Sequence, residues 1–147
     1  MKKKVLISTG GSGGHVIPAT IIFEHLKNKF DVFLETDKRG EVFIDSKKYT
    51  YKVFSSIKLD IFFKFPIVIY KFILIFFNSL NYLKKNNFNI VISTGGYMSV
   101  PTCLAAKLLG LDIFLFEPNM VIGRSNRLFL KFAKKVFCYS SNLKNFP

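Results

Sequence analysis

The chain has 147 residues, of which half are hydrophobic and 18 are Phe. This composition is enough for one domain with a sizeable core and excludes a disordered protein. The formal net charge is +13, from 22 Lys and Arg against 9 Asp and Glu, which favours an anionic partner: nucleic acid, anionic lipid or a phosphorylated substrate. Residues 1–4 precede only a short apolar run, whereas a secretory signal needs about 7–15 apolar residues. We therefore expect a cytoplasmic protein.

Short apolar runs alternate along the chain with segments of helical pattern. Strands are predicted at 5–8, 31–36, 51–55, 89–93, 112–116 and 135–139. Helices are predicted at 17–29, 38–46, 100–109 and 124–134. This alternation is typical of an α/β fold with a Rossmann-like, doubly wound parallel sheet, in which ligands bind beyond the carboxyl ends of the strands. We expect one domain over residues 1–140, with 141–147 as the start of a linker.

The first glycine-rich stretch, Thr9–His15, follows the first predicted strand and leads into the first predicted helix. Glycine permits positive φ angles and a close approach of the backbone to a ligand. The start of a helix adds unpaired N–H groups and the positive end of the helix dipole, which suit a phosphate group. The stretch predicts a phosphorylated or nucleotide-linked ligand within reach of His15. A histidine that only bonds to the backbone is the alternative.

A dinucleotide-binding domain of an oxidoreductase is another interpretation of these glycines. Glu35 lies 22 residues after Gly13, where an acid that binds ribose is expected. The glycine spacing does not fit, because the third glycine of G-x-G-x-x-G, counted from Gly11, falls on Val16. A phosphate loop of the NTPase kind is excluded, because no Lys-Ser or Lys-Thr pair follows the glycines.

Two further loops also follow predicted strands. Ser93–Pro101 contains two glycines and again leads into a helix, and Phe116–Arg127 carries several polar groups. Since the carboxyl ends of parallel strands meet at one edge of a sheet, we expect all three loops to lie together there. Taken singly, each of the two is also compatible with an ordinary surface turn.

The segment 57–85 is unusually apolar, above all over Ile61–Leu80. Lys64 and Lys71 argue against a membrane-spanning helix, because a central Lys costs about 2.5–3.5 kcal/mol on insertion. In a helix that begins near Pro66, the polar residues form a stripe only about 60° wide and leave a wide apolar face. That stripe consists of Lys71, Asn78, Tyr82 and Lys85. The pattern favours a helix at a membrane surface, with a core helix or a span as alternatives.

The chain has two cysteines, Cys103 and Cys138, far apart in sequence and flanked by apolar residues. This setting predicts two buried free thiols rather than a disulfide or a metal site.

Taken together, the three loops resemble the MurG family of bacterial glycosyltransferases. The resemblance rests on residues 10–19, on residues 95–110, and on the segment from Glu117-Pro118-Asn119 to Gly123–Arg127. Three motifs in order are far more specific than one, and the resemblance covers essentially the whole chain. It implies the amino-terminal half of a GT-B fold, in which two Rossmann-like domains face each other across a cleft and this half takes the lipid-linked acceptor.

The resemblance also implies an activity, which is inverting transfer of GlcNAc from UDP-GlcNAc to undecaprenyl-pyrophosphoryl-MurNAc-pentapeptide. This step converts lipid I to lipid II in peptidoglycan synthesis. His15 is then the candidate general base or acceptor-positioning group. The domain lacks an Asp-x-Asp motif, so no metal ligated by it and no cofactor is expected.

The remaining site residues are also assigned from the resemblance. Backbone N–H groups of Ser12, Gly13 and Gly14 are expected at the donor phosphates or sugar, and Asn119 at the GlcNAc moiety. Gly95, Gly96 and Tyr97 are candidates for the acceptor pyrophosphate, and Glu117 for orienting His15 or a sugar hydroxyl. Pro118 and Val100 depart from the family, which usually has Gln and often Gly at these positions.

The apolar segment and the Lys excess then suggest docking on the anionic inner face of the cytoplasmic membrane. The residues expected to contact the membrane are Phe72, Phe76, Lys64 and Lys71.

The donor half of the family is absent from this sequence, which leaves alternatives open. One is a membrane-side subunit that needs a separate donor-domain chain, as in the eukaryotic two-protein transferase that elongates dolichol-linked GlcNAc. Another is an inactive fragment. An oxidoreductase domain and a nucleic-acid-binding protein are less favoured, the latter because no nucleic-acid module is visible.

Overall fold

The computed structural model describes residues 2–54, 65–139, 144 and 146. These residues form a six-stranded, fully parallel sheet with the strand order β3-β2-β1-β4-β5-β6. The strands are β1 (Lys4–Ser8), β2 (Asp31–Asp37), β3 (Tyr51–Phe54), β4 (Ile90–Ser93), β5 (Asp112–Glu117) and β6 (Lys135–Cys138). The helices are α1 (Gly13–Leu26), α2 (Lys38–Glu41), α3 (Phe65–Lys85), α4 (Ser99–Leu108) and α5 (Arg124–Phe129). The predicted α/β class and parallel sheet are confirmed.

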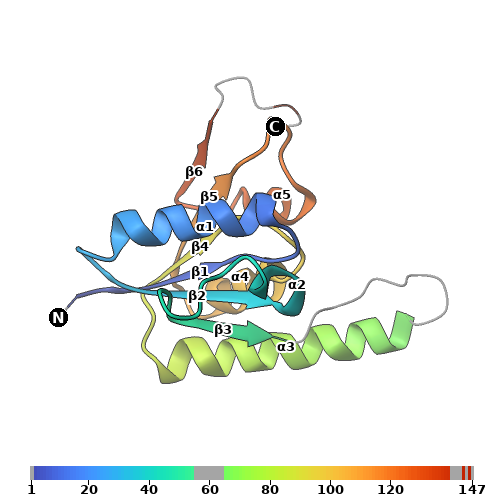
Figure 1. The fold of residues 1–147 in the computed structure, drawn as a ribbon. Helices are drawn as coiled ribbons and strands as arrows, with labels where there is room; N and C mark the ends of the chain where they lie inside the picture. Colours follow the sequence, from blue (N-terminus) through green and yellow to red (C-terminus); the bar gives the residue numbers. More distant parts are fainter. Residues whose placement is uncertain (1, 55–64, 140–143, 145, 147) are drawn as a thin grey trace.

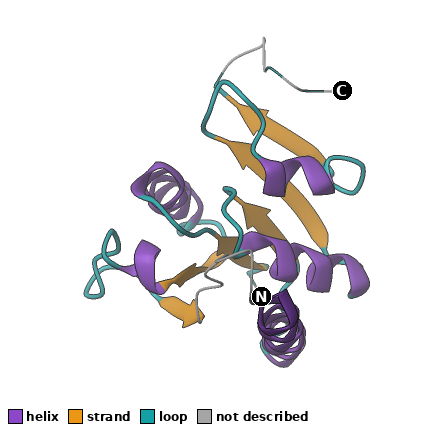
Figure 2. Cartoon of the chain, turned by 90° about the vertical axis from the view of Figure 1, so that its right-hand side faces the viewer, coloured by secondary structure: helices purple, strands orange, loops and turns teal. Residues whose placement is uncertain are grey.

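Helices cover the two faces of the sheet unequally. Figures 1 and 2 show α1 on one side of the sheet, with α4 and α5 on the other. α3 packs against α4 on that second side. The strand pleat explains the two cores, because successive side chains point to opposite faces. Val5 and Ile7 of β1 join the α1 core, whereas Leu6 between them joins the core under α3, α4 and α5.

Strand register brings the three loops to one edge, as the sequence predicts. Ser8 pairs with Ser93, and Ser93 pairs with Leu115, so β1 and β4 end at one level and β5 ends two residues further on. We call this the loop edge, and it comprises residues 9–15, 93–97 and 117–126.

The main differences from the predicted elements lie at helix ends. α1 begins at Gly13 rather than at residue 17, because Ser12 takes the extended conformation of an N-cap residue (φ −129°, ψ 161°) and the glycines after it are already helical. α2 ends at Glu41 and α5 ends at Phe129, in both cases before the predicted end. The chain after each of these helices continues in turns. Residues 57–64, the first part of the predicted apolar segment 57–85, lie outside the described residues.

Candidate functional site

The first glycine loop is hydrogen-bonded to Asp37, which is fully buried at the end of β2. Its Oδ1 accepts hydrogen bonds from the N–H of Gly11 (3.1 Å) and of Gly40 (2.9 Å), and its Oδ2 accepts two from Arg39. Burial by itself raises the pKa of Asp37, but these hydrogen bonds and the Arg39 charge outweigh it and hold the pKa below its ordinary value. An ionised carboxylate therefore holds the loop in shape.

Gly11 has a φ of +89°, which favours glycine, and the Arg39 guanidinium lies beside it. The sequence interpretation missed both Asp37 and Arg39. Their only sequence signal is an acid at a strand end followed by a glycine three residues later.

The start of α1 presents the predicted residues at the loop edge. The first intrahelical hydrogen bonds are donated by the N–H of His15 (3.1 Å) and of Val16 (3.2 Å) to the Ser12 carbonyl oxygen. Gly13 and Gly14 come before them, and the first N–H groups of a helix have no partner within it. Ser12 and Gly14 are exposed, so this helix end is open to a ligand.

His15 joins the first loop to the second. Its Nδ1 lies 2.8 Å from the carbonyl oxygen of Thr94, 79 residues away in sequence. A carbonyl oxygen only accepts hydrogen bonds, so Nδ1 carries the proton and Nε2 of the neutral ring keeps its lone pair. The group that orients His15 is thus the Thr94 carbonyl. Of the two roles expected for Glu117, the orienting of His15 is taken by this carbonyl, and the orienting of a sugar hydroxyl stays a prediction.

The glycines of the second loop allow this close approach. Gly95 and Gly96 have φ angles of +96° and +87°. A Cβ atom on Gly95 would lie 3.0 Å from the His15 ring, and one on Gly96 would lie 2.5 Å from the carbonyl oxygen of Gly10. The two glycine loops therefore pack backbone to backbone. Tyr97 follows them and is exposed just before α4.

Glu117 organises the third loop, and it is fully buried. Its Oε1 accepts hydrogen bonds from the N–H (3.2 Å) and the Nδ2 (3.0 Å) of Asn119, and its Oε2 accepts from the N–H of Gly123 (2.8 Å). Oε2 also accepts from Nδ2 of Asn126 at 3.1 Å. Asn119 is exposed at the loop edge, with its side-chain amide held by Glu117.

Asn126 is a residue that the sequence interpretation did not single out. It is fully buried, and it connects the third loop to Ser93 at the end of β4. The one sequence feature that could have identified Asn126 is its place in the Gly-x-x-Asn-Arg end of the third motif.

Glu35, considered above as a ribose-binding acid, lies in the core instead. Its Oε1 accepts hydrogen bonds from the hydroxyls of Ser8 (2.6 Å) and Thr102, and its side chain is 1% exposed. Burial raises the pKa of Glu35 to about 7, against the lowering effect of these two hydroxyls and of the Lys52 charge. A carboxyl group enclosed in this way is not available to a ribose.

One of the two cysteines differs from the predicted buried position. Cys103 is buried, and burial raises the pKa of its thiol to about 12, whereas Cys138 is exposed on β6. Within the described part of the chain, no three His, Cys, Asp or Glu side chains gather in a way that could hold a metal ion.

The helix α3 has one packed side and one bare side. Ile75 and Leu83 are buried, and the Ser79 hydroxyl bonds to that of Thr102 on α4 at 3.1 Å. Phe72 and Phe76 are half-buried and pack against the cores, contrary to their predicted outward position. The exposed apolar residues on the opposite side, which we call the α3 outer face, are Ile67, Ile69, Tyr70, Ile73, Leu74 and Phe77.

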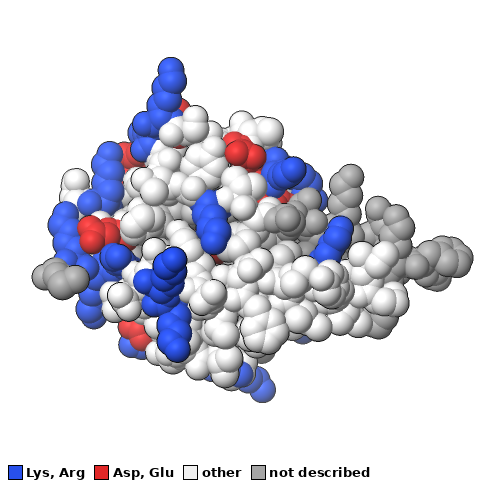
Figure 3. Space-filling model, turned by 90° about the horizontal axis from the view of Figure 1, so that it is seen from below, with Lys and Arg blue, Asp and Glu red and all other residues white. Residues whose placement is uncertain are grey.

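Lys71 is also exposed on α3, and Lys64 lies outside the described residues. Figure 3 views the molecule from the α3 side, where uncharged side chains cover most of the face and Lys and Arg are scattered over it. Among the described residues, Pro66–Lys85 is the one helical stretch long and apolar enough to cross a membrane by length and composition.

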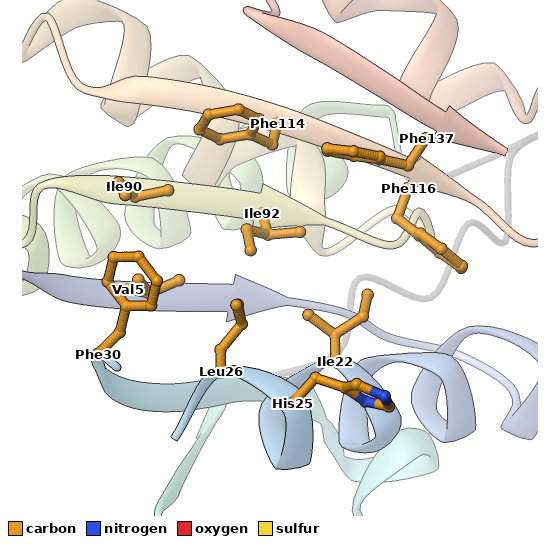
Figure 4. Close-up of a pocket in the computed structure, with 10 residues that line it drawn as sticks. All are labelled: Val5, Ile22, His25, Leu26, Phe30, Ile90, Ile92, Phe114, Phe116 and Phe137. Atoms are coloured by element: carbon orange, nitrogen blue, oxygen red, sulfur yellow. The ribbon is translucent and has the colours of Figure 1, made fainter. Parts of the chain in front are cut away.

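A second bare apolar surface lies beside α1, over β4, β5 and β6. Ile113 and Leu115 of β5 are buried on the α4 side, but Phe114 and Phe116 on the α1 side remain half-exposed. They line a hollow of about 560 Å³ (Figure 4). The other lining residues are Val5, Ile22, His25, Leu26, Phe30, Ile90, Ile92 and Phe137. This hollow was not predicted, because the sequence does not show which face of a strand is left uncovered.

The arrangement of loops can be compared with known proteins. The family described as "Glycosyltransferase family 28 N-terminal domain" matches residues 5–138. The chain belongs to this family. The resemblance to MurG proposed from the three motifs is thereby confirmed at the level of the family and fold.

Relatives of this glycosyltransferase family 28 chain carry one name, UDP-N-acetylglucosamine--N-acetylmuramyl-(pentapeptide) pyrophosphoryl-undecaprenol N-acetylglucosamine transferase. The protein from Pelagibacter ubique is 50% identical over 100% of this chain and 42% of its own length. A Wolbachia protein is 37% identical over 90% of this chain and 37% of its own. The family 28 chain thus spans about two fifths of the length of these relatives.

Solved structures also resemble this chain in fold. The crystal structure of Acinetobacter baumannii MurG matches with a TM-score of 0.83 at 25% identity, over 99% of this chain and 43% of that one. The UDP-GlcNAc 2-epimerase of Methanocaldococcus jannaschii matches with a TM-score of 0.67 at 16% identity, over 97% and 41%, and this match shows the fold alone.

Proposed function

We propose that this chain forms the acceptor-side half of a glycosyltransferase that moves GlcNAc from UDP-GlcNAc to undecaprenyl-pyrophosphoryl-MurNAc-pentapeptide. The names of the family 28 relatives and the match to MurG support this substrate pair. The observation that carries the proposal is the placing of His15, whose Nδ1 is bound to the Thr94 carbonyl, with all three motif loops at one edge.

In this proposal, His15 acts as the general base. The acceptor 4-hydroxyl of MurNAc attacks the anomeric carbon of GlcNAc, a new C–O bond forms on the opposite face of the sugar, and the bond to UDP breaks. Nε2 of His15 takes the hydroxyl proton, which leaves a histidinium ion held by the Thr94 carbonyl. General-base catalysis of this kind contributes about 10²- to 10⁴-fold to the rate.

The glycine loops supply charge stabilisation in the same scheme. The N–H groups of Gly13 and Gly14, at the start of the 14-residue helix α1, face the developing negative charge on the departing diphosphate. Gly95, Gly96 and Tyr97 would contact the acceptor pyrophosphate. Asn119 would contact the GlcNAc moiety.

The scheme also requires a donor domain. We propose that residues 1–140 are the acceptor domain and that 141–147 begin the linker toward a donor domain. This chain covers 42% and 37% of the lengths of the two relatives, and we propose that transfer needs a donor half in addition to residues 1–140. A non-catalytic membrane-side subunit and an inactive fragment are the competing interpretations.

The α3 outer face is the surface that we propose to lie on the anionic cytoplasmic face of the inner membrane. It is apolar and close to exposed Lys71, and Lys84 and Lys85 end the helix. Apolar side chains edged by Lys suit the interfacial region of an anionic bilayer. Surface contact is favoured over a span because the opposite side of α3 packs on α4 through Ser79 and Thr102.

The test is GlcNAc transfer from labelled UDP-GlcNAc to a lipid I analogue, with the chain alone and with the separately expressed donor half of a related transferase. We expect activity only in the mixture, and a loss of about 10²- to 10⁴-fold in His15→Ala. His25→Ala is the matched control, since His25 also lies on α1 but lines the hollow of Figure 4. A folded His15→Ala protein with unchanged rate would contradict the catalytic role.

A further inference from the structure

A chain of buried hydrogen bonds connects the third loop to His15. Asn126 is 0% exposed, and its Oδ1 accepts a hydrogen bond from the Ser93 hydroxyl at 2.9 Å. The Ser93 oxygen in turn accepts from the N–H of Gly95 at 3.1 Å. That N–H belongs to the same peptide unit as the Thr94 carbonyl, which binds Nδ1 of His15. One peptide plane is thus held at both ends, by Ser93 on one side and by His15 on the other.

The donor and the acceptor of each hydrogen bond between Asn126 and His15 follow from the chemistry of the groups. Nδ2 of Asn126 faces the Phe116 carbonyl and Oε2 of Glu117, both at 3.1 Å. A carbonyl and a carboxylate accept, so both Nδ2 protons are donated there and Oδ1 must point to Ser93. The single Ser93 hydroxyl proton then goes to Asn126, and the Ser93 lone pair is left for the Gly95 N–H.

Burial makes this arrangement specific. Ser93, Glu117 and Asn126 are each 0–1% exposed, and a buried polar group that loses its hydrogen-bond partner destabilises the folded protein. Loss of the Asn126 side chain therefore removes the acceptor of the Ser93 hydroxyl, whose oxygen holds the Thr94–Gly95 peptide. Gly95 has a positive φ and no side chain to hold this peptide in place.

We propose that Asn126, acting through Ser93 and the Thr94–Gly95 peptide, is a positioning residue that keeps His15 protonated at Nδ1 with Nε2 directed away as the proton acceptor. The use of Nε2 in transfer rests on the proposed function, whereas the proton position does not. Asn126 therefore contributes to the site without touching a substrate.

The test reads the proton position directly, by NMR of the imidazole nitrogens of the ¹⁵N-labelled chain at a pH where the rings are neutral. The chain has only two histidines. His25, with its Nδ1 at 2.8 Å from the Ile21 carbonyl on the far turn of α1, is an internal reference. We expect a single Nδ1-protonated form of His15 in the natural chain and a mixture of both forms in Asn126→Ala, with His25 unchanged.

A second variant keeps the test decisive if Asn126→Ala fails to fold. Ser93→Ala breaks the same chain of bonds one step nearer to His15 with almost no change in volume, and we expect it to give the same mixture. The double variant should add nothing further, since both changes interrupt one path. Ser125→Ala is the matched control, because Ser125 is buried beside Asn126 on α5.

A single Nδ1-protonated His15 in folded Ser93→Ala or Asn126→Ala would overturn the proposal. Asn126 would then only fasten the third loop. The measurement needs neither donor nor acceptor, so a negative transfer assay would count against the proposed function and not against this inference.

Discussion

The loop edge and the α3 outer face lie on one small domain but differ in the interactions of their side chains. At the loop edge, buried polar groups form a closed set of hydrogen bonds around Asp37, Glu117 and Asn126. On the α3 outer face, apolar side chains such as Tyr70 and Phe77 are about 60% exposed, and substitution there should leave the fold intact. The first region therefore depends on exact geometry, and the second depends only on apolar area.

The largest expected effect breaks the loop edge at Gly96. Its Cβ would lie 2.5 Å from the Gly10 carbonyl oxygen, at a φ of +87°. We expect Gly96→Ala to lower the free energy of unfolding by about 3 kcal/mol, as a strained backbone combined with an overpacked contact. Urea unfolding followed by circular dichroism measures it.

Gly110→Ala is the matched control for this change. Gly110 also has a positive φ, +68°, but among the described residues beyond its chain neighbours no atom lies within 4 Å of its Cβ position. It should therefore report only the backbone cost, about 1–2 kcal/mol. Equal losses in the two variants would show that the two glycine loops are not pressed together.

A smaller effect concerns Glu35, which connects the two regions. Its partner Thr102 also bonds to Ser79 of α3. Because the folded pKa of about 7 lies above the ordinary Glu value of 4.5, the folded chain retains this proton when the unfolded chain has lost it. The retained proton contributes about 3 kcal/mol to the free energy of unfolding. This contribution is complete below the pKa of Glu35 in the unfolded chain and is lost as the pH rises to about 7.

Glu35→Gln tests this directly. The variant should lose the decline in unfolding free energy between about pH 5 and about pH 8 that the natural chain shows. It should also be the more stable of the two at the upper end. Parallel pH profiles for both proteins would mean that Glu35 is ionised in the folded chain throughout.

The smallest expected effect on stability is on the α3 outer face. Phe77→Asp should change the free energy of unfolding by only about 0.5 kcal/mol, since the side chain is exposed. Binding to anionic vesicles, measured by co-sedimentation, should fall about tenfold or more, because burial of a Phe side chain contributes about 1.5–3 kcal/mol. Leu128→Asp, at 62% exposure on α5, is the control and should bind as the natural chain does.

The sequence predicted much of the fold because the pattern of apolar runs and glycines is local. It placed six strands, the three loops and their common edge, and all are confirmed. Contacts within the site depend on residues far apart in sequence. His15 meets Thr94 and Ser93 meets Asn126 only after the sheet has formed, and no spacing rule encodes such a pair.

The α3 helix shows a different kind of limit. The polar stripe is visible in the sequence, but apolar residues occupy nearly all of the remaining positions. The sequence therefore does not distinguish the packed side of the helix from the exposed side. The contacts of α3 with α4 decide this, and they turn Phe72 and Phe76 inward and Phe77 outward.

The half-bare sheet beside α1 affects how the chain behaves in solution (Figure 4). Its aromatic side chains and the α3 outer face point in different directions, so attachment to a vesicle leaves the sheet surface uncovered. Mutual repulsion from the +13 net charge keeps molecules apart, but its range shrinks from about 30 Å at 0.01 M salt to about 10 Å at 0.1 M. We therefore expect ionic strength, more than protein concentration, to set how long this chain remains monodisperse.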